Sequence, residues 1–353
     1  MSIKALIVED SAVVRELLNH ILSSDPAIHI VGTANNGTEA LQAVQALKPD
    51  VVTMDINMPV MDGYEATRRI METHPVPIVI VSVSVDPREV ATTIRALNAG
   101  ALAAVQKPMG IGHPDHEHTA KTLVQTVKLM SEVKVVKRWP MRYLETPPRP
   151  VTGDSISTFR ETGADNIEII AMGASAGGPP TLQTILSRLP VDMPVPILVV
   201  QHISPGFIDG FAQFLAVSCK LPVHVAIRSE DLKAGHVYLA PGGTHMGVVK
   251  GGRVDLFDGA HVNGVRPSIS YLFQAVADVF ANRAAGVLLT GMGRDGAEGL
   301  KSMKDKGAVT IAQNEESSLV FSMPCEAIKL GAATHVLSPH EIAAALSKLV
   351  RKQ

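Results

Sequence analysis

The sequence predicts an α/β protein made of two doubly wound, mostly parallel sheet units. In the first part of the chain, short β-branched runs such as VVTM (51–54) alternate with helical patterns such as NGTEALQAVQAL (36–47). The alternation resumes at IEIIAMG (167–173) and closes with the helical pattern HEIAAALSKLV (340–350). Strands that alternate with helices indicate βαβ units and a parallel sheet. A chain of 353 residues also exceeds one typical core, so two domains are expected.

Five candidate strands lie in the first unit, which we expect to span residues 1–130. They are IKALIV (3–8), IHIVGTA (28–34), VVTM (51–54), PIVIV (77–81) and ALAAV (101–105). Helical patterns lie between them, and the amphipathic pattern HTAKTLVQTVKLMSEV (118–133) closes the unit. Five parallel strands of this kind fit the flavodoxin-like order.

A linker is predicted at residues 131–165, and the second unit then covers 166–350. The linker is rich in Pro, Ser, Thr and charged residues and sustains no apolar period. The middle of the second unit, about 222–257, contains short strand patterns and Gly-rich turns.

The composition limits the classes of function. Hydrophobic residues make up 46% of the chain and charged residues 19%, with a formal net charge of -2. This balance does not support a nucleic-acid groove, which needs a concentrated basic face. Cys219 and Cys325 match no metal or redox spacing, and the N-terminus runs directly into a strand pattern without a signal peptide. No apolar stretch approaches the roughly 18 residues of a membrane helix, so we expect a cytoplasmic protein.

Charged and hydroxyl side chains stand where four strands of the first unit end. Glu9 and Asp10 follow the first strand, Asp55 the third, Ser82 the fourth and Lys107 the fifth. Because the carboxyl ends of the strands in an open α/β sheet form one crevice, we expect these side chains to meet. Three adjacent carboxylates repel each other unless a cation such as Mg²⁺ holds them. One carboxylate can then accept a phosphoryl group, with Lys107 neutralising its charge and Ser82 hydrogen-bonding an oxygen.

The second unit places a serine, a histidine and an aspartate after three separate strand patterns. Ser175 lies in GASAGGPP, His202 in QHISPGF and Asp295 in GMGRDG. The first segment satisfies G-x-S-x-G, a strand-turn-helix that exposes a serine hydroxyl. A serine nucleophile needs a base, and the base needs a group that fixes its tautomer. The chain order Ser, His, Asp differs from that of α/β-hydrolases, which argues against an ordinary lipase or esterase.

Each of these residues also has an ordinary structural interpretation, as do the acids of the first unit. A Gly/Ser loop can bind phosphate or simply turn the chain. A histidine can be packed in a core, and an aspartate after a strand can cap the next helix. The complete sets, each at several strand ends of one sheet, favour a phosphoryl site in the first unit and acyl transfer in the second.

Two other histidine segments are candidate sites. His113, His116 and His118 form the cluster GIGHPDHEH, for which an exposed loop is favoured over a metal site because no cysteine or fixed scaffold supports one. His245 in APGGTH either lines the second cleft or has a structural role in a turn.

The segment MDINMPVMDG (54–63), together with the ED pair at 9–10 and the KP pair at 107–108, resembles the receiver domain of bacterial response regulators. The resemblance implies that Asp55 is the phosphoacceptor and that Ser82 and Lys107 are the switch residues. It implies an Mg²⁺ site formed by Glu9, Asp10, Asp55 and the backbone carbonyl of Asn57. One departure is Ala104, because receivers usually carry an aromatic residue at that position.

The three motifs of the second unit, with APGGTH, NGVRPS and TIAQNEESS, resemble the catalytic domain of chemotaxis protein-glutamate methylesterases. The resemblance implies a catalytic triad and an oxyanion donor, namely Ser175, His202, Asp295 and the backbone N–H of Met292. Two departures are Ala176, where the family often has Thr, and Cys325, where arginine is common.

Together the resemblances predict a phosphorylation-regulated hydrolase. It would demethylate glutamate methyl esters on chemoreceptors, release methanol and deamidate receptor glutamines, with no cofactor for the hydrolysis. A chemotaxis histidine kinase would supply the phosphoryl group, and the unphosphorylated receiver would limit access to Ser175. The alternative is a non-catalytic two-component regulator whose second domain only binds a partner. A transcriptional regulator is disfavoured, because no helix-turn-helix pattern or basic stripe follows the linker.

Overall fold

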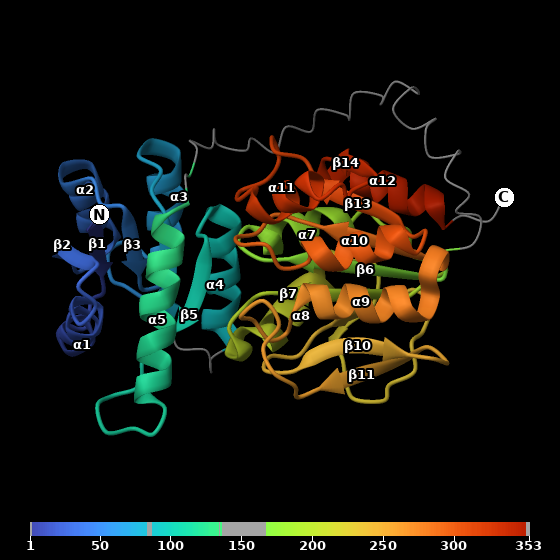
Figure 1. The fold of residues 1–353 in the computed structure, drawn as a ribbon. Helices are drawn as coiled ribbons and strands as arrows, with labels where there is room; N and C mark the ends of the chain where they lie inside the picture. Colours follow the sequence, from blue (N-terminus) through green and yellow to red (C-terminus); the bar gives the residue numbers. More distant parts are fainter. Residues whose placement is uncertain (1, 83–86, 134, 136–166, 351–353) are drawn as a thin grey trace. The chain divides into compact units, whose positions relative to one another are not determined.

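The computed structural model describes residues 2–82, 87–133, 135 and 167–350 (Figure 1). The chain divides into two compact units between Arg142 and Tyr143, and each is described by itself. The predicted linker therefore lies almost entirely outside the described residues. Within the described part of the chain, no helix has both the length and the apolar character needed to cross a bilayer.

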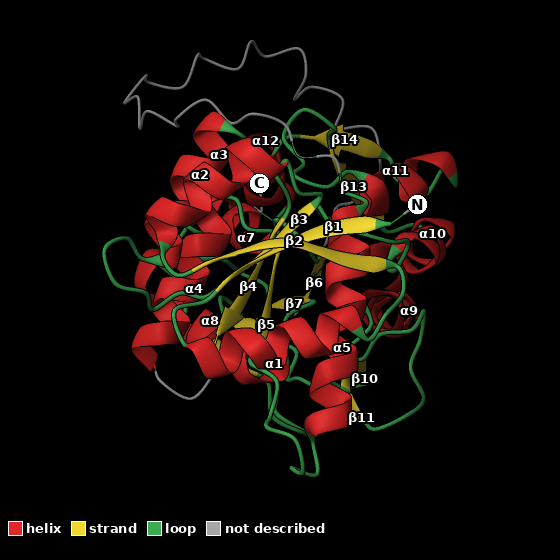
Figure 2. Cartoon of the chain, turned by 90° about the vertical axis from the view of Figure 1, so that its left-hand side faces the viewer, coloured by secondary structure: helices red, strands yellow, loops and turns green. Residues whose placement is uncertain are grey.

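The first unit is a five-stranded parallel sheet with the order β2-β1-β3-β4-β5, which is the predicted flavodoxin-like order. Its strands are β1 (Ile3–Val8), β2 (Ile28–Ala34), β3 (Val51–Met54), β4 (Ile78–Ser82) and β5 (Ala103–Gln106). Its helices are α1 (Ala12–Ser23), α2 (Gly37–Leu47), α3 (Gly63–Thr73), α4 (Pro87–Ala99) and α5 (His116–Ser131). Helices α1 and α5 cover one face of this sheet and α2, α3 and α4 the other (Figure 2).

Short polar side chains begin the helices directly after the strand ends. Asn36 accepts hydrogen bonds from the first turn of α2, and Asp62 accepts one from Glu65 N–H in α3. These caps satisfy N–H groups that the helix cannot pair internally. The chain therefore turns at the carboxyl edge of the sheet, where the predicted site residues stand.

The histidine cluster differs from its predicted position. α5 begins at His116 rather than at His118, so both residues belong to its first turn and only His113 lies in the exposed loop. His116 Nδ1 lies 2.6 Å from Met109 O, which ties the helix start to the loop before it. Among the described residues the histidine cluster forms no group with metal-ligand spacing.

The second unit is a seven-stranded parallel sheet with the order β14-β13-β12-β6-β7-β9-β8. Its strands are β6 (Ile169–Ala174), β7 (Ile197–Gln201), β8 (Val223–Val225), β9 (Val237–Leu239), β12 (Ala284–Leu288), β13 (Val309–Gln313) and β14 (His335–Leu337). Its α-helices are α7 (Gly178–Leu186), α8 (Ile208–Ser218), α9 (Ile269–Phe280), α10 (Ala297–Asp305), α11 (Ser322–Lys329) and α12 (Pro339–Leu349). The chain leaves β6 for β7 on one side and returns to β12 on the other. The carboxyl end of β6 is therefore the switch point at which such sheets bind ligands.

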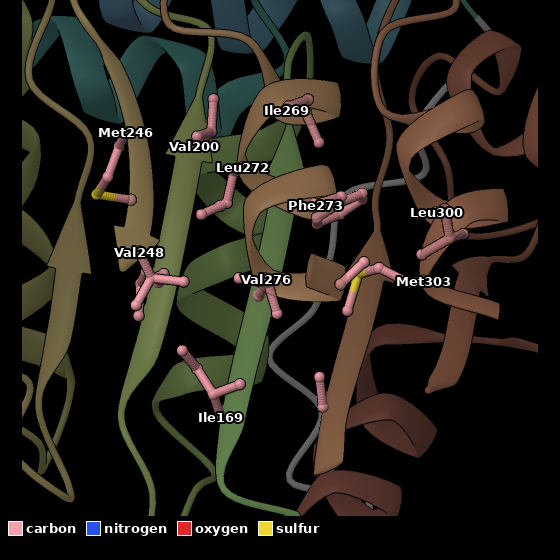
Figure 3. Packing of buried hydrophobic residues seen from close by; sticks show 14 of the residues in the cluster. Ile169, Val200, Met246, Val248, Ile269, Leu272, Phe273, Val276, Leu300 and Met303 are labelled. Atoms are coloured by element: carbon pink, nitrogen blue, oxygen red, sulfur yellow. The ribbon is translucent and has the colours of Figure 1, made fainter. Parts of the chain in front are cut away.

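Strands β10 (His245–Val249) and β11 (Arg253–Phe257) form a separate antiparallel pair. Helix α9 packs against both this pair and β6, and its apolar side chains fill the space between them (Figure 3). Gly173 of β6 permits this packing, because a Cβ there would lie 2.1 Å from Ile269 Cγ2. The first turn of α9 is thereby held close to the end of β6.

Both faces of the larger sheet are covered. Ile169 and Ala171 belong to the core cluster under α9, and alternate residues of a strand point to opposite faces. Ile170 and Met172, which face the other side, are also fully buried. This two-sided burial explains why the strand reads as a continuous apolar run in the sequence.

Candidate functional site

Ser175 and His202 lie next to each other at the ends of adjacent strands. β6 and β7 pair in parallel with Ala174 opposite Gln201, so the following residues are neighbours. His202 N–H donates to Ala174 O at 2.9 Å. On the other side, Ser175 N–H donates to Thr290 O at 3.0 Å, just beyond the end of β12. The serine therefore stands between the two strands that carry the other predicted site residues.

A hydrogen bond joins His202 to Asp295. His202 Nε2 lies 3.1 Å from Asp295 Oδ2, and the two side chains are 16% and 5% exposed. Because β7 and β12 flank β6, this contact bridges the strand that ends just before Ser175. The three residues predicted from separate motifs are therefore brought to one sheet edge.

Four donors besides His202 hold the Asp295 carboxylate. Ser268 Oγ donates to Oδ1 at 2.8 Å and Ile269 N–H to Oδ2 at 2.7 Å. Ser270 N–H and Asn263 Nδ2 also donate to Oδ1, at 3.2 and 3.0 Å. Two of these donors are backbone groups of the first turn of α9, where the helix dipole favours negative charge.

These donors determine the ionisation of Asp295. Burial alone would raise the pKa of its carboxyl, but the hydrogen bond and charge of His202, with the bonds from Asn263 and Ser268, hold the pKa well below its usual value. Asp295 is therefore a permanently charged acceptor that fixes the orientation of the imidazole.

The turn after Ser175 leaves two backbone donors available. Gly178 N–H donates to Ser175 O at 2.8 Å, and Pro179 and Pro180 have no N–H. The backbone N–H groups of Ala176 and Gly177 have no hydrogen-bond acceptor within the described residues. Their N–H groups precede α7, where the helix dipole favours a developing negative charge.

The backbone N–H of Met292 has a similar position. Gly291 lies against Ser175, because a Cβ there would be 2.7 Å from Ser175 Cβ. Gly291 N–H donates to Val320 O and Gly293 N–H to Ser322 Oγ, whereas Met292 N–H has no acceptor in the described part of the chain. The geometry is consistent with an oxyanion donor beside Ser175.

Two buried side chains that the sequence did not point to connect these strand ends. Gln201 Nε2 donates to both Ser175 O and His202 O at 2.9 Å. Thr290 Oγ1 donates to Ala176 O at 2.9 Å and accepts from Val320 N–H. Gln201 precedes His202 in the quoted motif, and its position at the last residue of a buried strand was the available signal.

No direct hydrogen bond joins Ser175 Oγ to His202 within the described residues. Such bonds are often long before substrate binds and shorten in the complex. The nitrogen that would face the serine is Nδ1, because Nε2 is engaged by Asp295.

The first unit assembles its own predicted side chains at the carboxyl edge. Lys107 Nζ lies 3.1 Å from Glu9 Oε2 and 3.0 Å from Asp55 Oδ1. One carboxylate oxygen from each of Glu9, Asp10 and Asp55 lies within 4.8 Å of the others. Lys107 N–H also donates to Ser82 O at 2.9 Å, which places the fifth residue on the neighbouring strand end.

Burial changes the ionisation of this cluster. Glu9 is completely buried, and burial together with the charge of Asp55 raises its pKa to about 7 despite Lys107. Burial also raises the pKa of Asp55, again against the effect of Lys107. Glu9 Oε2 is buried and accepts no hydrogen bond of good geometry, although Lys107 is close. A buried oxygen without a donor, within a set of hard oxygen ligands, fits a divalent cation such as Mg²⁺.

The three departures from the resemblances fall at different places. Ala104 is buried in β5, and Ala176 is buried in the turn after Ser175. Cys325 is a free, half-buried thiol in α11. His245 is completely buried, so of its two interpretations the structure favours the structural one.

A receiver-type sheet with a buried acidic cluster, followed by an α/β unit with a Ser, His and Asp at its switch point, defines a response regulator with a hydrolase domain. Residues 5–113 match the response regulator receiver domain, and residues 170–346 match the CheB methylesterase family. The chain belongs to the CheB methylesterase family.

Relatives match over nearly the whole chain. A protein-glutamate methylesterase/protein-glutamine glutaminase of Nitrosospira multiformis is 53% identical over 99% of this chain and 98% of its own length. One from Geobacter metallireducens is 51% identical over 99% of this chain and all of its own. The crystal structure of the Thermotoga maritima CheB methylesterase catalytic domain covers 52% of this chain and 100% of its own, with 37% identity and a TM-score of 0.51.

Proposed function

We propose that this protein hydrolyses glutamate methyl esters on methyl-accepting chemotaxis receptors and deamidates specific receptor glutamines. The observation that supports this most directly is the hydrogen bond from His202 to Asp295 across the strand that ends just before Ser175. We further propose that it acts in the cytoplasm, on receptor segments exposed there. The names of its relatives supply the substrate class.

Ser175 is the nucleophile and His202 the base. Asp295 accepts a hydrogen bond from the Nε2–H of His202, so Nδ1 carries the lone pair that takes the proton from Ser175 Oγ. Oγ attacks the ester carbonyl carbon and the C=O electrons move onto the oxygen. Asp295 stays ionised and stabilises the imidazolium that forms.

The oxyanion is stabilised by backbone donors. The N–H of Met292 is free of other acceptors in the described residues, and so are the N–H groups of Ala176 and Gly177, which directly follow Ser175 in the chain. Donors held in place by a buried backbone do not have to reorganise as the charge forms. Because these are backbone groups, the Ala176 departure leaves them unchanged.

His202 then changes from base to acid. His202 gives its proton to the leaving oxygen, methanol departs, and a water activated by the same nitrogen cleaves the acyl-enzyme. With a glutamine substrate the leaving group is ammonia, and the acyl-enzyme is identical. Side chains and backbone groups supply every step, so no cofactor is required for hydrolysis.

In the receiver, Asp55 is the phosphoacceptor. Glu9, Asp10, Asp55 and the carbonyl of Asn57 would hold Mg²⁺, which when bound neutralises charge on the phosphoryl oxygens. Lys107, now paired with Asp55, would bind a phosphoryl oxygen, and Ser82 would donate to another. A chemotaxis histidine kinase is the proposed phosphoryl donor, and phosphorylation is proposed to raise the hydrolase rate.

The test is methanol release from methylated receptors by the full chain and by Ser175→Ala, with and without a small phosphodonor and Mg²⁺. Wild-type protein should release methanol faster with the phosphodonor. Ser175→Ala should lose about 10⁶-fold in kcat, because the nucleophile acts as a unit with its base. Retained release in Ser175→Ala would exclude a serine hydrolase. No release by either protein would favour a non-catalytic regulator.

A further inference from the structure

His245 is a buried histidine that the proposed mechanism does not use. It is the first residue of β10 and is 0% exposed. Its ring stacks on Tyr271 of α9, with centroids 4.8 Å apart and an interplanar angle of 24°. A buried imidazole has two polar nitrogens, and both need partners.

The two ring nitrogens bind the two ends of one loop. Nε2 lies 2.9 Å from Ala260 O, and Nδ1 lies 3.1 Å from Ser268 N. A carbonyl oxygen can only accept, and a backbone N–H can only donate. The partners therefore require a neutral ring with its proton on Nε2 and a lone pair on Nδ1.

The loop between these ends carries two side chains that hold Asp295. Asn263 Nδ2 and Ser268 Oγ both donate to its Oδ1. Asn263 has a φ of 53°, in the left-handed region that asparagine adopts more easily than most residues. Val262 and Val265 form a backbone bridge across the loop, which ties Asn263 at the tip to the two ends of the loop.

We propose that His245 is a positioning residue for the hydrolysis. By holding Ala260 and Ser268 together, its neutral imidazole keeps Asn263 and Ser268 on the Asp295 carboxylate. Asp295 is thereby aligned with His202. This inference rests on the proposed function and assigns APGGTH and NGVRPS to one task, the support of the triad aspartate.

The experiment measures kcat and KM for methyl-ester hydrolysis by the full chain carrying substitutions of His245. His245→Phe keeps the ring and its stacking on Tyr271 but removes both hydrogen bonds. We expect kcat to fall about 10²-fold with KM within about twofold, because misplacing a catalytic group by an ångström costs about that much. His236→Phe is the matched control, since this half-buried histidine of the same unit stacks on Tyr238 and should keep wild-type kcat.

Two conservative variants separate positioning from folding. In His245→Asn the amide oxygen stands about where Nδ1 stands and can accept from Ser268 N–H, so kcat should recover about tenfold over His245→Phe. His245→Gln can restore only the bond to Ala260 and should recover less. These variants also carry the test if His245→Phe does not fold, as judged by thermal unfolding.

A wild-type kcat in folded His245→Phe, or a loss confined to KM, would overturn the inference. Equal kcat in the Asn and Phe variants would overturn it too. Failure of the proposed function is recognised separately, because Ser175→Ala would then keep the methanol release of the wild-type protein.

Discussion

Asp55 and Asp295 occupy equivalent places in two parallel sheets, yet their surroundings differ. Both are nearly fully buried beyond the carboxyl end of a strand. Within the described residues Asp55 has one backbone donor, from Ile56, and shares Lys107 with the buried Glu9. Asp295 has five donors, including two from a helix N-terminus. The pKa of Asp55 is consequently raised by burial, whereas that of Asp295 is held low in spite of burial.

The difference matches the roles proposed above for the two carboxylates, a phosphoacceptor for Asp55 and a triad aspartate for Asp295. A phosphoacceptor must change partners, so its oxygens are left with few fixed donors and with room for a cation. A triad aspartate must keep its charge and its hydrogen-bond partners, so both of its oxygens are held by donors fixed in the fold. On this proposal the carboxyl edge of the sheet provides a reactive carboxylate in the first unit and a passive one in the second.

The largest expected effect comes from removing the charge of the passive carboxylate. Asp295→Asn keeps the volume but presents an amide to the donors of α9 and to His202 Nε2, which favours the wrong tautomer. We expect kcat for methanol release to fall about 10⁴-fold. Phosphoryl uptake at Asp55 should be unchanged.

The matched control is Asp305→Asn, an exposed aspartate of α10 that pairs only with Lys301 within the described residues. Its kcat should equal that of the wild-type protein. A loss of less than tenfold in Asp295→Asn would mean that the five donors serve stability alone, and the comparison between the two carboxylates would fail.

The second effect concerns the reactive carboxylate. Asp55→Asn should abolish phosphoryl uptake from a small phosphodonor, and the phosphodonor should no longer change the methanol rate. Asp50→Asn is the control, because Asp50 lies before the opposite end of β3 and accepts from Lys4 N–H. Phosphoryl uptake is measured with a labelled phosphodonor. If Asp55→Asn still took up the label, the phosphoacceptor would lie elsewhere.

Much of this comparison could be predicted from sequence, because buried parallel strands are continuous apolar runs. β2 (Ile28–Ala34) and β3 (Val51–Met54) begin and end at the predicted residues. Polar residues that directly follow such runs, such as Asp55 and Ser175, could therefore be assigned to the sheet edge from the amino-acid pattern alone.

The environment of each residue could not be predicted in this way. Asn263 and Ser268 lie 32 and 27 positions before Asp295 in the chain, and contacts between loops leave no periodic signal. His116 is likewise helical although its sequence pattern predicts a loop, since the bond from its ring to Met109 O depends on the folded loop. The sequence thus locates the carboxylates but does not reveal that one is held by five donors and the other by few.

The third prediction uses the pKa of Glu9. In the folded protein its carboxyl titrates at about 7, compared with a usual value of 4.5. Between these values the folded protein holds a proton that the unfolded chain has released, so stability is highest below pH 4.5 and falls as pH rises through 7. The loss for the metal-free first unit should be about 3 kcal/mol. Mg²⁺ should reduce it, because the ion binds the deprotonated folded cluster.

Urea unfolding followed by methyl NMR signals of β1 and β3 reports this unit separately. Glu9→Gln should flatten its pH dependence in the metal-free protein, since the amide does not titrate. If the free energy of unfolding of the metal-free unit is constant from pH 5 to pH 7.5, a range that includes the expected pKa of about 7, Glu9 is not held protonated. The reactive site would then resemble Asp295 more closely than the geometry implies.

The smallest effect compares two helix caps of the second unit. Ser268 caps α9 and also donates to Asp295, whereas Ser338 caps α12 and donates to Glu341 in a capping box. Each Ser→Ala change should cost about 1 kcal/mol of unfolding free energy, because both remove a cap. Only Ser268→Ala should lower kcat, by about tenfold, because only that hydroxyl binds the triad carboxylate. If both variants lose stability equally and keep full kcat, the hydrogen bond from Ser268 to Asp295 contributes only to stability and is not needed to orient His202.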